Sequence, residues 1–265
     1  MLQESQDLLA ESDELHEFLQ TLEPGDWKRS TDFMGWTPWD VVAHLHYFDL
    51  VSLLALRGEE VFAPERSGLF KAIRDGRTNR ELARERFGDI APDQLMKHWQ
   101  ETCREMATQL GESHPKRRLP WFGPDMGVRM FTTARFMETW AHGQEIYDLM
   151  GVRRRYNDRI KNIAVIGMKT FGWTFANRGE EVPGPPPYVQ LRAPSGEVWE
   201  WGEPSEEEFV RGDAIDFSHV VTQGRNVADT ALEVQGAVAT RWMSIAQCFA
   251  GGPVDPPLPG TRQGS

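Results

Sequence analysis

A segment rich in proline and glycine, residues 177–187, separates two parts of the chain that have different hydrophobic patterns. Proline fixes its own backbone and cannot donate the hydrogen bond that a helix interior needs, so regular structure has to stop in such a run. Before this segment apolar residues recur at helical spacing, and after it they alternate as they do in strands. The sequence therefore predicts a mostly α protein, with a helical bundle over residues 1–176 and a small α+β domain over residues 188–250.

Long amphipathic helices account for most of the first part. One of them has a clear start, because Thr37 can cap it, Pro38 suits the first helical position and Asp40 occupies the place of a capping-box acid. Glycine and proline punctuate residues 59–90, which predicts only a short helix there. The loop of residues 111–127 can either roof a site or simply connect two helices across the surface. The predicted helices cover residues 3–22, 38–57, 78–87, 92–110, 127–149 and 156–176.

The second part is predicted to contain both strands and helices. Alternating residues on either side of a Pro-Ser-Gly turn indicate a β-hairpin over residues 189–201. A helix over residues 206–222, a strand over 231–234 and a helix over 236–249 are expected to follow. The tail from Gly251 is rich in proline, and we expect it to be disordered.

Charge and cysteine content limit the partners and the compartment. The chain has 29 basic and 40 acidic side chains and a formal net charge of −11, which argues against a nucleic-acid surface. No apolar run approaches the roughly 18 residues of a membrane span, and the N-terminus has no signal pattern. Cys103 and Cys248 lie far apart and match no zinc or redox spacing, which favours a reducing compartment. We therefore expect a cytoplasmic protein that binds neither nucleic acid nor membrane.

A pair of residues late in the helical part carries the most distinctive chemistry. Glu138 and His142 are four residues apart, so on a helix their side chains lie on one face, one turn apart. A carboxylate and an imidazole can hold a divalent ion together, and zinc needs about three protein ligands to do chemistry. His44 borders the apolar face of its own helix and is the candidate for the third ligand, whereas His46 points elsewhere. The same residues are also compatible with a solvated helix face and a core histidine bonded to a neighbour.

Three features together resemble the DinB-like metal-dependent superfamily and, within it, the mycothiol-dependent maleylpyruvate isomerase-like proteins. They are the Ala-His-Leu motif at His44 after a capped Trp-Thr-Pro-Trp-Asp start, the later pair Glu138 and His142, and the small tail domain. The resemblance implies an up-down four-helix bundle that binds a divalent ion, typically zinc, through His44, Glu138 and His142. It also implies a sterol-carrier-like tail domain with a functionally important arginine, for which Arg225 is the best positional match.

The resemblance further implies chemistry with a low-molecular-weight thiol such as mycothiol. A thiol on zinc would lose its proton near neutral pH and become a nucleophile. It could then add to a small electrophilic substrate, whose carboxylate Arg225 could hold as a catalytic residue. We therefore expect a thiol-dependent isomerase or transferase whose partners are a small-molecule substrate and the thiol. The loop and the linker do not identify a maleylpyruvate pocket, and a homodimer is left open.

Two other functions are compatible with the sequence. The chain can be a non-catalytic protein that binds a small or lipid-like ligand and keeps a structural metal site. It can also be a zinc hydrolase, which would need a general base near the ion. Glu145 and Asp148 lie on the same helix as the pair, but both are expected to point away from the face of His142.

Overall fold

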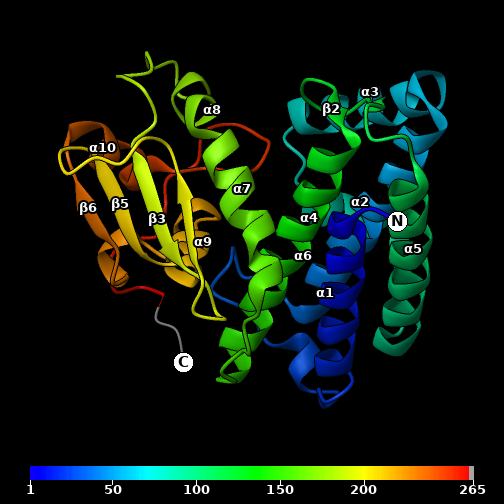
Figure 1. Cartoon of the computed structure of the whole chain (residues 1–265). Coiled ribbons are helices and arrows are strands. Elements are labelled where there is room, and N and C mark those ends of the chain that lie inside the picture. Colours follow the sequence, from blue (N-terminus) through cyan, green and yellow to red (C-terminus); the bar gives the residue numbers. More distant parts are fainter. Residues whose placement is uncertain (263–265) are drawn as a thin grey trace. The chain divides into compact units, whose positions relative to one another are not determined.

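The computed structural model describes residues 1–262 of the chain (Figure 1). The chain divides into two compact units, one ending at Met150 and the other beginning at Gly151. We predicted this boundary near residue 176, so it lies earlier than expected. The reason is that the helical residues 161–176 pack against other helices of the second unit.

Four long helices form the bundle of the first unit, as predicted. α1 (Gln3–Leu19) and α2 (Pro38–Arg57) each pack against α5 (Pro92–Glu112) and α6 (Val128–Met150). Large apolar side chains from all four helices fill the space between them, and their removal from water stabilises the bundle. The fully buried side chains include Leu8, Leu15, Leu45, Trp99, Phe136 and Trp140.

The start of α2 has the predicted capping box. The hydroxyl of Thr37 accepts a hydrogen bond from the backbone N–H of Asp40 (3.3 Å), and the carboxylate of Asp40 accepts one from the N–H of Thr37 (2.9 Å). Two arginines of α4 (Asn79–Phe87), Arg80 and Arg84, also donate to the buried carboxylate of Asp40. The first turn of α2 is therefore held firmly, and with it the residues one and two turns further along.

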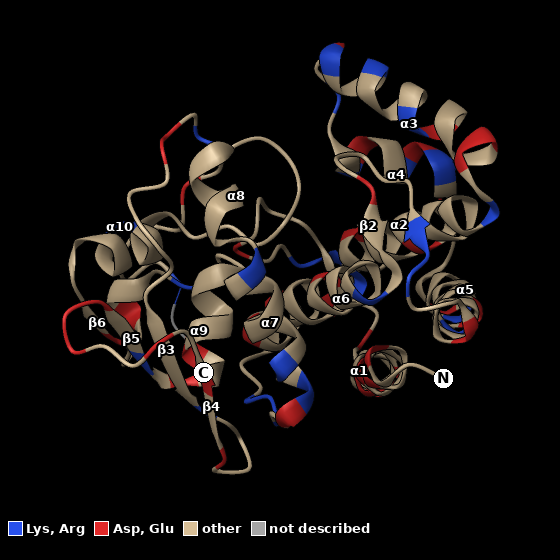
Figure 2. Ribbon diagram, turned by 45° about the horizontal axis from the view of Figure 1, so that its top comes forward, with Lys and Arg blue, Asp and Glu red and all other residues tan. Residues whose placement is uncertain are grey.

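Residues 59–90 are more helical than predicted. α3 (Glu59–Arg74) precedes α4 and continues through Pro64, although proline and glycine argued against a helix here. α3 packs against α2 and buries Phe62 and Leu69, and this tertiary packing outweighs the weak local preference. Acidic and basic residues are interspersed on α3 and α4 (Figure 2), where Arg86 and Glu65 form one ion pair at 3.2 Å.

The connection between α5 and α6 contains a short hairpin. β1 (Arg118–Leu119) and β2 (Met126–Gly127) pair antiparallel and leave residues 120–125 as the turn between them. α6 then begins directly after β2. The hairpin and α3 lie at the same end of the first unit (Figure 1).

α2 is long and apolar enough, by length and composition alone, to cross a membrane. We expected no apolar run of this length from the sequence. In the fold, 83% of the most apolar 18-residue stretch of α2 is buried, so its apolar side chains belong to the core of the bundle.

The second unit combines a mixed four-stranded sheet with helices. The strand order is β4-β3-β5-β6, in which β3 pairs antiparallel with β4 and parallel with β5, and β5 pairs antiparallel with β6. The pair of β3 and β4 is the predicted hairpin. The strands are β3 (Tyr188–Arg192), β4 (Val198–Trp201), β5 (Phe209–Asp213) and β6 (Glu233–Gln235). The helices are α7 (Lys161–Lys169), α8 (Phe171–Ala176), α9 (Ala214–Val221) and α10 (Ala237–Ile245). Short 3-10 turns cover Asp26–Lys28, Asp158–Ile160 and Val227–Asp229.

Two predicted helices of the second unit are wrong in extent. The helix expected over residues 156–176 is a 3-10 turn followed by α7 and α8, which are separated at Thr170. The helix expected over residues 206–222 begins as strand β5 and becomes α9 only at Ala214. β5 forms because β3 offers it a parallel partner, and no local pattern reports such a pairing.

The tail after Gly251 has no helix or strand within residues 251–262, yet it makes specific contacts. The N–H of Val254 donates to the side chain of Gln247 (3.0 Å), and the amide of Asn226 donates to the carbonyl of Pro257 (2.8 Å). The predicted disorder therefore does not describe this part of the tail. The prediction also covered residues 263–265, which lie outside the described residues.

Candidate metal centre

Two helices of the bundle supply the three candidate ligands. His44 lies in the second turn of α2, and Glu138 and His142 lie one turn apart on α6. One carboxylate oxygen of Glu138, Oε2, is 3.3 Å from Nε2 of His44 and also 3.3 Å from Nε2 of His142. The donor atoms of the three residues all lie within 4.8 Å of one another. The fold thus brings together three side chains that two distant segments contribute.

Burial and mutual contact set the charges of these residues. Burial, together with the neighbouring His142, lowers the pKa of His44 to about 4. Burial by itself would raise the pKa of Glu138, but the two imidazoles that contact this carboxylate hold its pKa well below the usual range. At neutral pH Glu138 is therefore ionised and His44 is neutral, and these are the protonation states in which both groups bind metal ions.

The separations of the two imidazole nitrogens from the Glu138 carboxylate suit a metal ion. Zinc bonds of about 2.0–2.1 Å in tetrahedral directions place neighbouring donor atoms about 3.3 Å apart. The two separations to Glu138 have this value. Two imidazoles and one carboxylate are also a ligand set of catalytic zinc sites, which keep one position open. The side chains of Glu138 and His142 are 23% and 14% exposed, so the site is not sealed from solvent.

Aromatic rings surround both imidazoles. Trp36 stacks on the ring of His142, with an interplanar angle of 2° and centroids 5.5 Å apart, and Phe33 meets the same ring edge-on at 5.1 Å. Phe48, about one turn beyond His44 on α2, lies 4.8 Å from the ring of His44. The position of Trp36 could be expected because it belongs to the capped start of α2. No sequence pattern marks Phe33, because it reaches the site only through the fold of the turn before α2.

A buried ion pair joins the same two helices next to the candidate ligands. Arg135, about one turn before Glu138 on α6, donates two hydrogen bonds to Oδ1 of Asp49 on α2, at 2.9 and 3.1 Å. The indole of Trp99 donates to Oδ2 of Asp49 at 3.1 Å. The side chains of Arg135 and Asp49 are only 3% and 1% exposed. The pair therefore fixes α2 to α6 inside the bundle, and the sequence pattern gave no sign of it.

Arg225, the predicted catalytic residue, lies in the second unit shortly after α9. It is 5% exposed, and its guanidinium donates to the carbonyl of Gly224 at 2.8 Å. Burial, with the charges of Arg225 and Arg154, lowers the pKa of His219 to about 3. The hydroxyl of Tyr156 lies 3.3 Å from Nε2 of His219. Buried positive charge thus gathers in this part of the unit, and the catalytic role of Arg225 stays a prediction.

The two acidic residues considered for a hydrolase do not join the group of candidate ligands within the described residues. Glu145 is 6% exposed on α6. Asp148 accepts a hydrogen bond from the side chain of Gln144 at 2.9 Å. Neither observation favours a general base beside the candidate ion.

Comparison with known proteins identifies the family. Residues 8–147, which are more than half of the chain, match the family model of the mycothiol maleylpyruvate isomerase N-terminal domain. The chain belongs to this family. An uncharacterized protein found in two strains of Mycobacterium tuberculosis is 35% identical to this maleylpyruvate isomerase-like chain over 247 residues, which are 93% of this chain and 95% of the relative.

Solved structures share the fold of this maleylpyruvate isomerase-like protein. The crystal structure of the mycothiol-dependent maleylpyruvate isomerase matches it with a TM-score of 0.54 and 12% sequence identity. The match covers 82% of this chain and 86% of that one, and the structure of a mutant of the same enzyme matches equally. At this identity the likeness concerns the fold, which is a helical domain followed by a small α+β domain.

Proposed function

We propose that this maleylpyruvate isomerase-like protein is a metal-dependent enzyme that uses a thiol. His44, Glu138 and His142 hold a divalent ion, zinc in this proposal. A low-molecular-weight thiol such as mycothiol reacts with a small electrophile, as in an isomerase or a transferase. The observation that carries the proposal is the convergence of three donors within 4.8 Å around an ionised Glu138. Membership of the mycothiol maleylpyruvate isomerase family supports a thiol as the second component.

The residues of the chain prepare the site for the ion. When bound, the ion would supply a positive charge that lowers the pKa of a thiol and orients its sulfur. Glu138 contributes one negative charge and the imidazoles contribute none, so much of that positive charge stays available to a bound thiol. Trp36 and Phe33 pack on the ring of His142 and restrict its rotation. Asp49 neutralises Arg135, so that the nearby guanidinium does not repel a cation.

We also propose that Arg225 binds an anionic group of the substrate. A guanidinium can bind a carboxylate with two parallel hydrogen bonds, and burial strengthens such an interaction. Arg225→Lys keeps the charge but loses the two-pronged geometry. We expect KM for a carboxylate-bearing substrate to rise more in Arg225→Ala than in Arg225→Lys. Unchanged KM in both variants would contradict this role.

The remaining expectations about partners follow the same proposal. The net charge of −11 favours small-molecule partners over nucleic acid. We propose a cytoplasmic location, where low-molecular-weight thiols are kept reduced.

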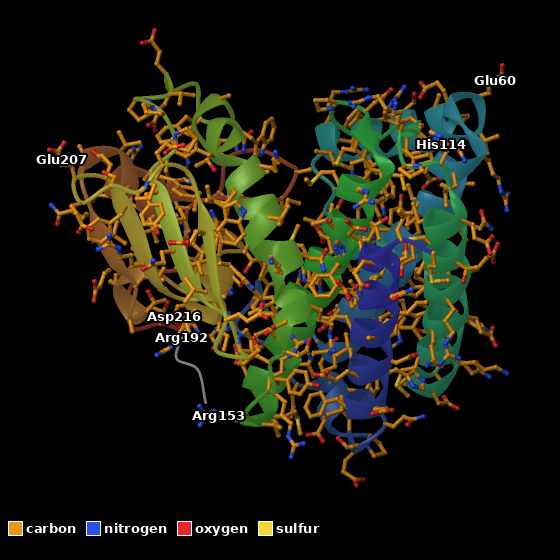
Figure 3. The ribbon with its side chains drawn as sticks, in the orientation of Figure 1. Glu60, His114, Arg153, Arg192, Glu207 and Asp216 are labelled. Carbon is orange, nitrogen blue, oxygen red and sulfur yellow. The ribbon has the colours of Figure 1, made fainter. Side chains whose placement is uncertain are left out.

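Metal analysis of the full chain, purified without chelators, tests the proposal. We expect about one divalent ion per wild-type chain and almost none in His142→Ala. The control is His114→Ala, which removes an exposed histidine of the first unit (Figure 3) and should retain the ion. The loaded wild type should also lower the pKa of added mycothiol, which the ultraviolet absorbance of the thiolate reports. A wild-type chain without a stoichiometric ion would overturn the proposal.

A further inference from the structure

A row of aromatic rings leads away from the candidate metal centre. Phe48 lies 4.8 Å from the ring of His44, and the rings of Trp121 and Phe122 lie 6.4 and 6.0 Å from that of Phe48. Phe48 belongs to α2, whereas Trp121 and Phe122 belong to the turn of residues 120–125 between β1 and β2. We call Phe48, Trp121 and Phe122 the aromatic row. The hairpin turn therefore does more than connect two helices, because its rings reach a residue that contacts the candidate site.

The aromatic row is partly exposed and rests on rings that are fully buried. Its three members are half-buried, whereas Phe62 and Phe131 are completely inaccessible. Trp121 stacks on Phe62 at 5.9 Å with an interplanar angle of 12°, and it meets Phe131 edge-on at 4.8 Å. These contacts hold Trp121 from behind and keep its position fixed. The three half-buried rings are thus held against one another and against the core, and Phe48 connects them to His44.

Several arginines near the aromatic row are already engaged within the first unit. Arg66, which lies over the ring of Phe62, pairs with a glutamate of α3. Arg117 and Arg118, at the start of the hairpin, each donate to a backbone carbonyl. Arg135, whose charge reaches His44, is bonded twice to a buried aspartate. A small dicarboxylate would have to compete for these guanidiniums, whereas a flat apolar group would simply cover the exposed rings.

We propose that the aromatic row binds the flat apolar body of the electrophilic substrate. The inference rests on the proposed function and names its substrate class, which is an aryl-substituted α,β-unsaturated carbonyl compound, with or without one carboxylate for Arg225, rather than a small dicarboxylate. In the reaction the sulfur forms a bond to the β-carbon while the C=C π bond breaks, and the proton of the thiol ends on the α-carbon. The addition therefore balances without an oxidant or a further reactant.

Binding of an unreactive analogue tests the row independently of any thiol chemistry. The probe is 4-phenylbutan-2-one, a saturated ketone that cannot accept a thiol, and butan-2-one is the matched probe without the ring. Binding to the full chain is measured by ligand-observed NMR. An aromatic pair of this kind changes affinity by about two- to tenfold. We expect the phenyl ketone to bind more tightly than butan-2-one, and to bind about two- to tenfold more weakly to Trp121→Leu.

A matched variant controls for the loss of an aromatic ring elsewhere in the bundle. Phe18 is half-buried and stacks on Tyr147 at 3.9 Å, outside the aromatic row. Phe18→Leu should bind the phenyl ketone as the wild type does, and thermal unfolding of each variant verifies that it is folded. If Trp121→Leu does not fold, Phe122→Leu in the same turn provides the test. Equal binding by the wild type and the row variants, or displacement of the phenyl ketone by an equal concentration of maleate, would overturn the inference.

An activity measurement separates this inference from the proposed function. The loaded chain is supplied with mycothiol and either 4-phenylbut-3-en-2-one or maleate, and the adduct is measured by mass spectrometry against the uncatalysed rate. We expect acceleration with the phenyl enone, and a higher KM for it in Trp121→Leu than in Phe18→Leu. If neither electrophile reacts but the phenyl ketone still binds at the row, the thiol chemistry is refuted and the binding surface is not. If maleate is the better substrate, the inferred substrate class is wrong.

Discussion

Replacement of Asp49 by asparagine should destabilise the first unit strongly. The substitution keeps the shape of the side chain but removes the charge that balances Arg135, which is 3% exposed and donates to Asp49 at 2.9 and 3.1 Å. Loss of one partner from a buried ion pair costs about 3–5 kcal/mol, because the other charge stays buried without compensation. We therefore expect Asp49→Asn to lower the free energy of unfolding by about that amount.

The matched double variant distinguishes an unpaired charge from a lost attraction. Asp49→Leu combined with Arg135→Met removes both charges and fills similar volume. Replacement of a whole buried pair by apolar residues is often neutral or stabilising by about 1–4 kcal/mol. The double variant should therefore be at least as stable as the wild type, although Asp49→Asn alone is much less stable.

Urea unfolding of the metal-free chain, followed by helical circular dichroism, measures these differences. A chelator is needed because a bound ion would add stability by mass action. Protonation supplies a second check on the single variant Arg135→Met. Burial raises the pKa of Asp49, while Arg135 opposes that rise. Without Arg135 the pKa rises further, so the folded state binds the proton more tightly than the unfolded state. The cost of Arg135→Met should then shrink as the pH falls toward 4. A cost of Asp49→Asn below about 1 kcal/mol, or a double variant less stable than either single variant, would refute this reasoning.

Three further predictions concern the bundle. Glu138→Gln keeps the shape of the ligand but removes its charge. It should weaken the binding of a divalent ion by more than roughly 10–100-fold, which is the loss typical for residues that only hydrogen-bond to a metal ligand. Competition with a chromophoric chelator measures the affinity. Burial, with the neighbouring His98, lowers the pKa of His46 to about 4, so the unfolded state binds this proton first as the pH falls. Through His46, the free energy of unfolding of the wild type should fall by about 1.4 kcal/mol per pH unit below pH 6.5, reaching about 3 kcal/mol at pH 4. Urea unfolding should show a smaller loss over that range in His46→Leu. Thr37→Ala should cost about 1 kcal/mol as a lost cap, and Asp40→Ala should cost more because that carboxylate also holds two arginines of α4, which thermal unfolding would show.

The elements predicted from the sequence are those that short spacings define. The capping box at Thr37 and Asp40 depends on two residues three positions apart, and the structure contains both of its hydrogen bonds. The hairpin of β3 and β4 depends on alternation around a tight turn, and it too is present. In both cases the residues that must interact are neighbours in the chain, so the pattern contains the necessary information.

The errors arose where a distant partner overrules the local pattern. α3 continues through Pro64 because it packs against α2, and β5 is a strand because β3 pairs with it. The burial of Asp49 against Arg135 could not be predicted from α2, because most of the residues around Asp49 on this helix are buried. Helical periodicity therefore could not show which of its sides carries a partner.

By itself, the sequence determined the division into a helical and a mixed part, the start of α2 and the placement of Glu138 and His142 on one helical face. Each of these follows from residues only a few positions apart. The tertiary structure alone decided that His44 meets this pair at 3.3 Å from Glu138, that Arg135 and Asp49 are buried together, and that the hairpin turn places its rings against Phe48. These contacts join segments that are remote in the chain, and only the packing of the whole bundle fixes the distances between them.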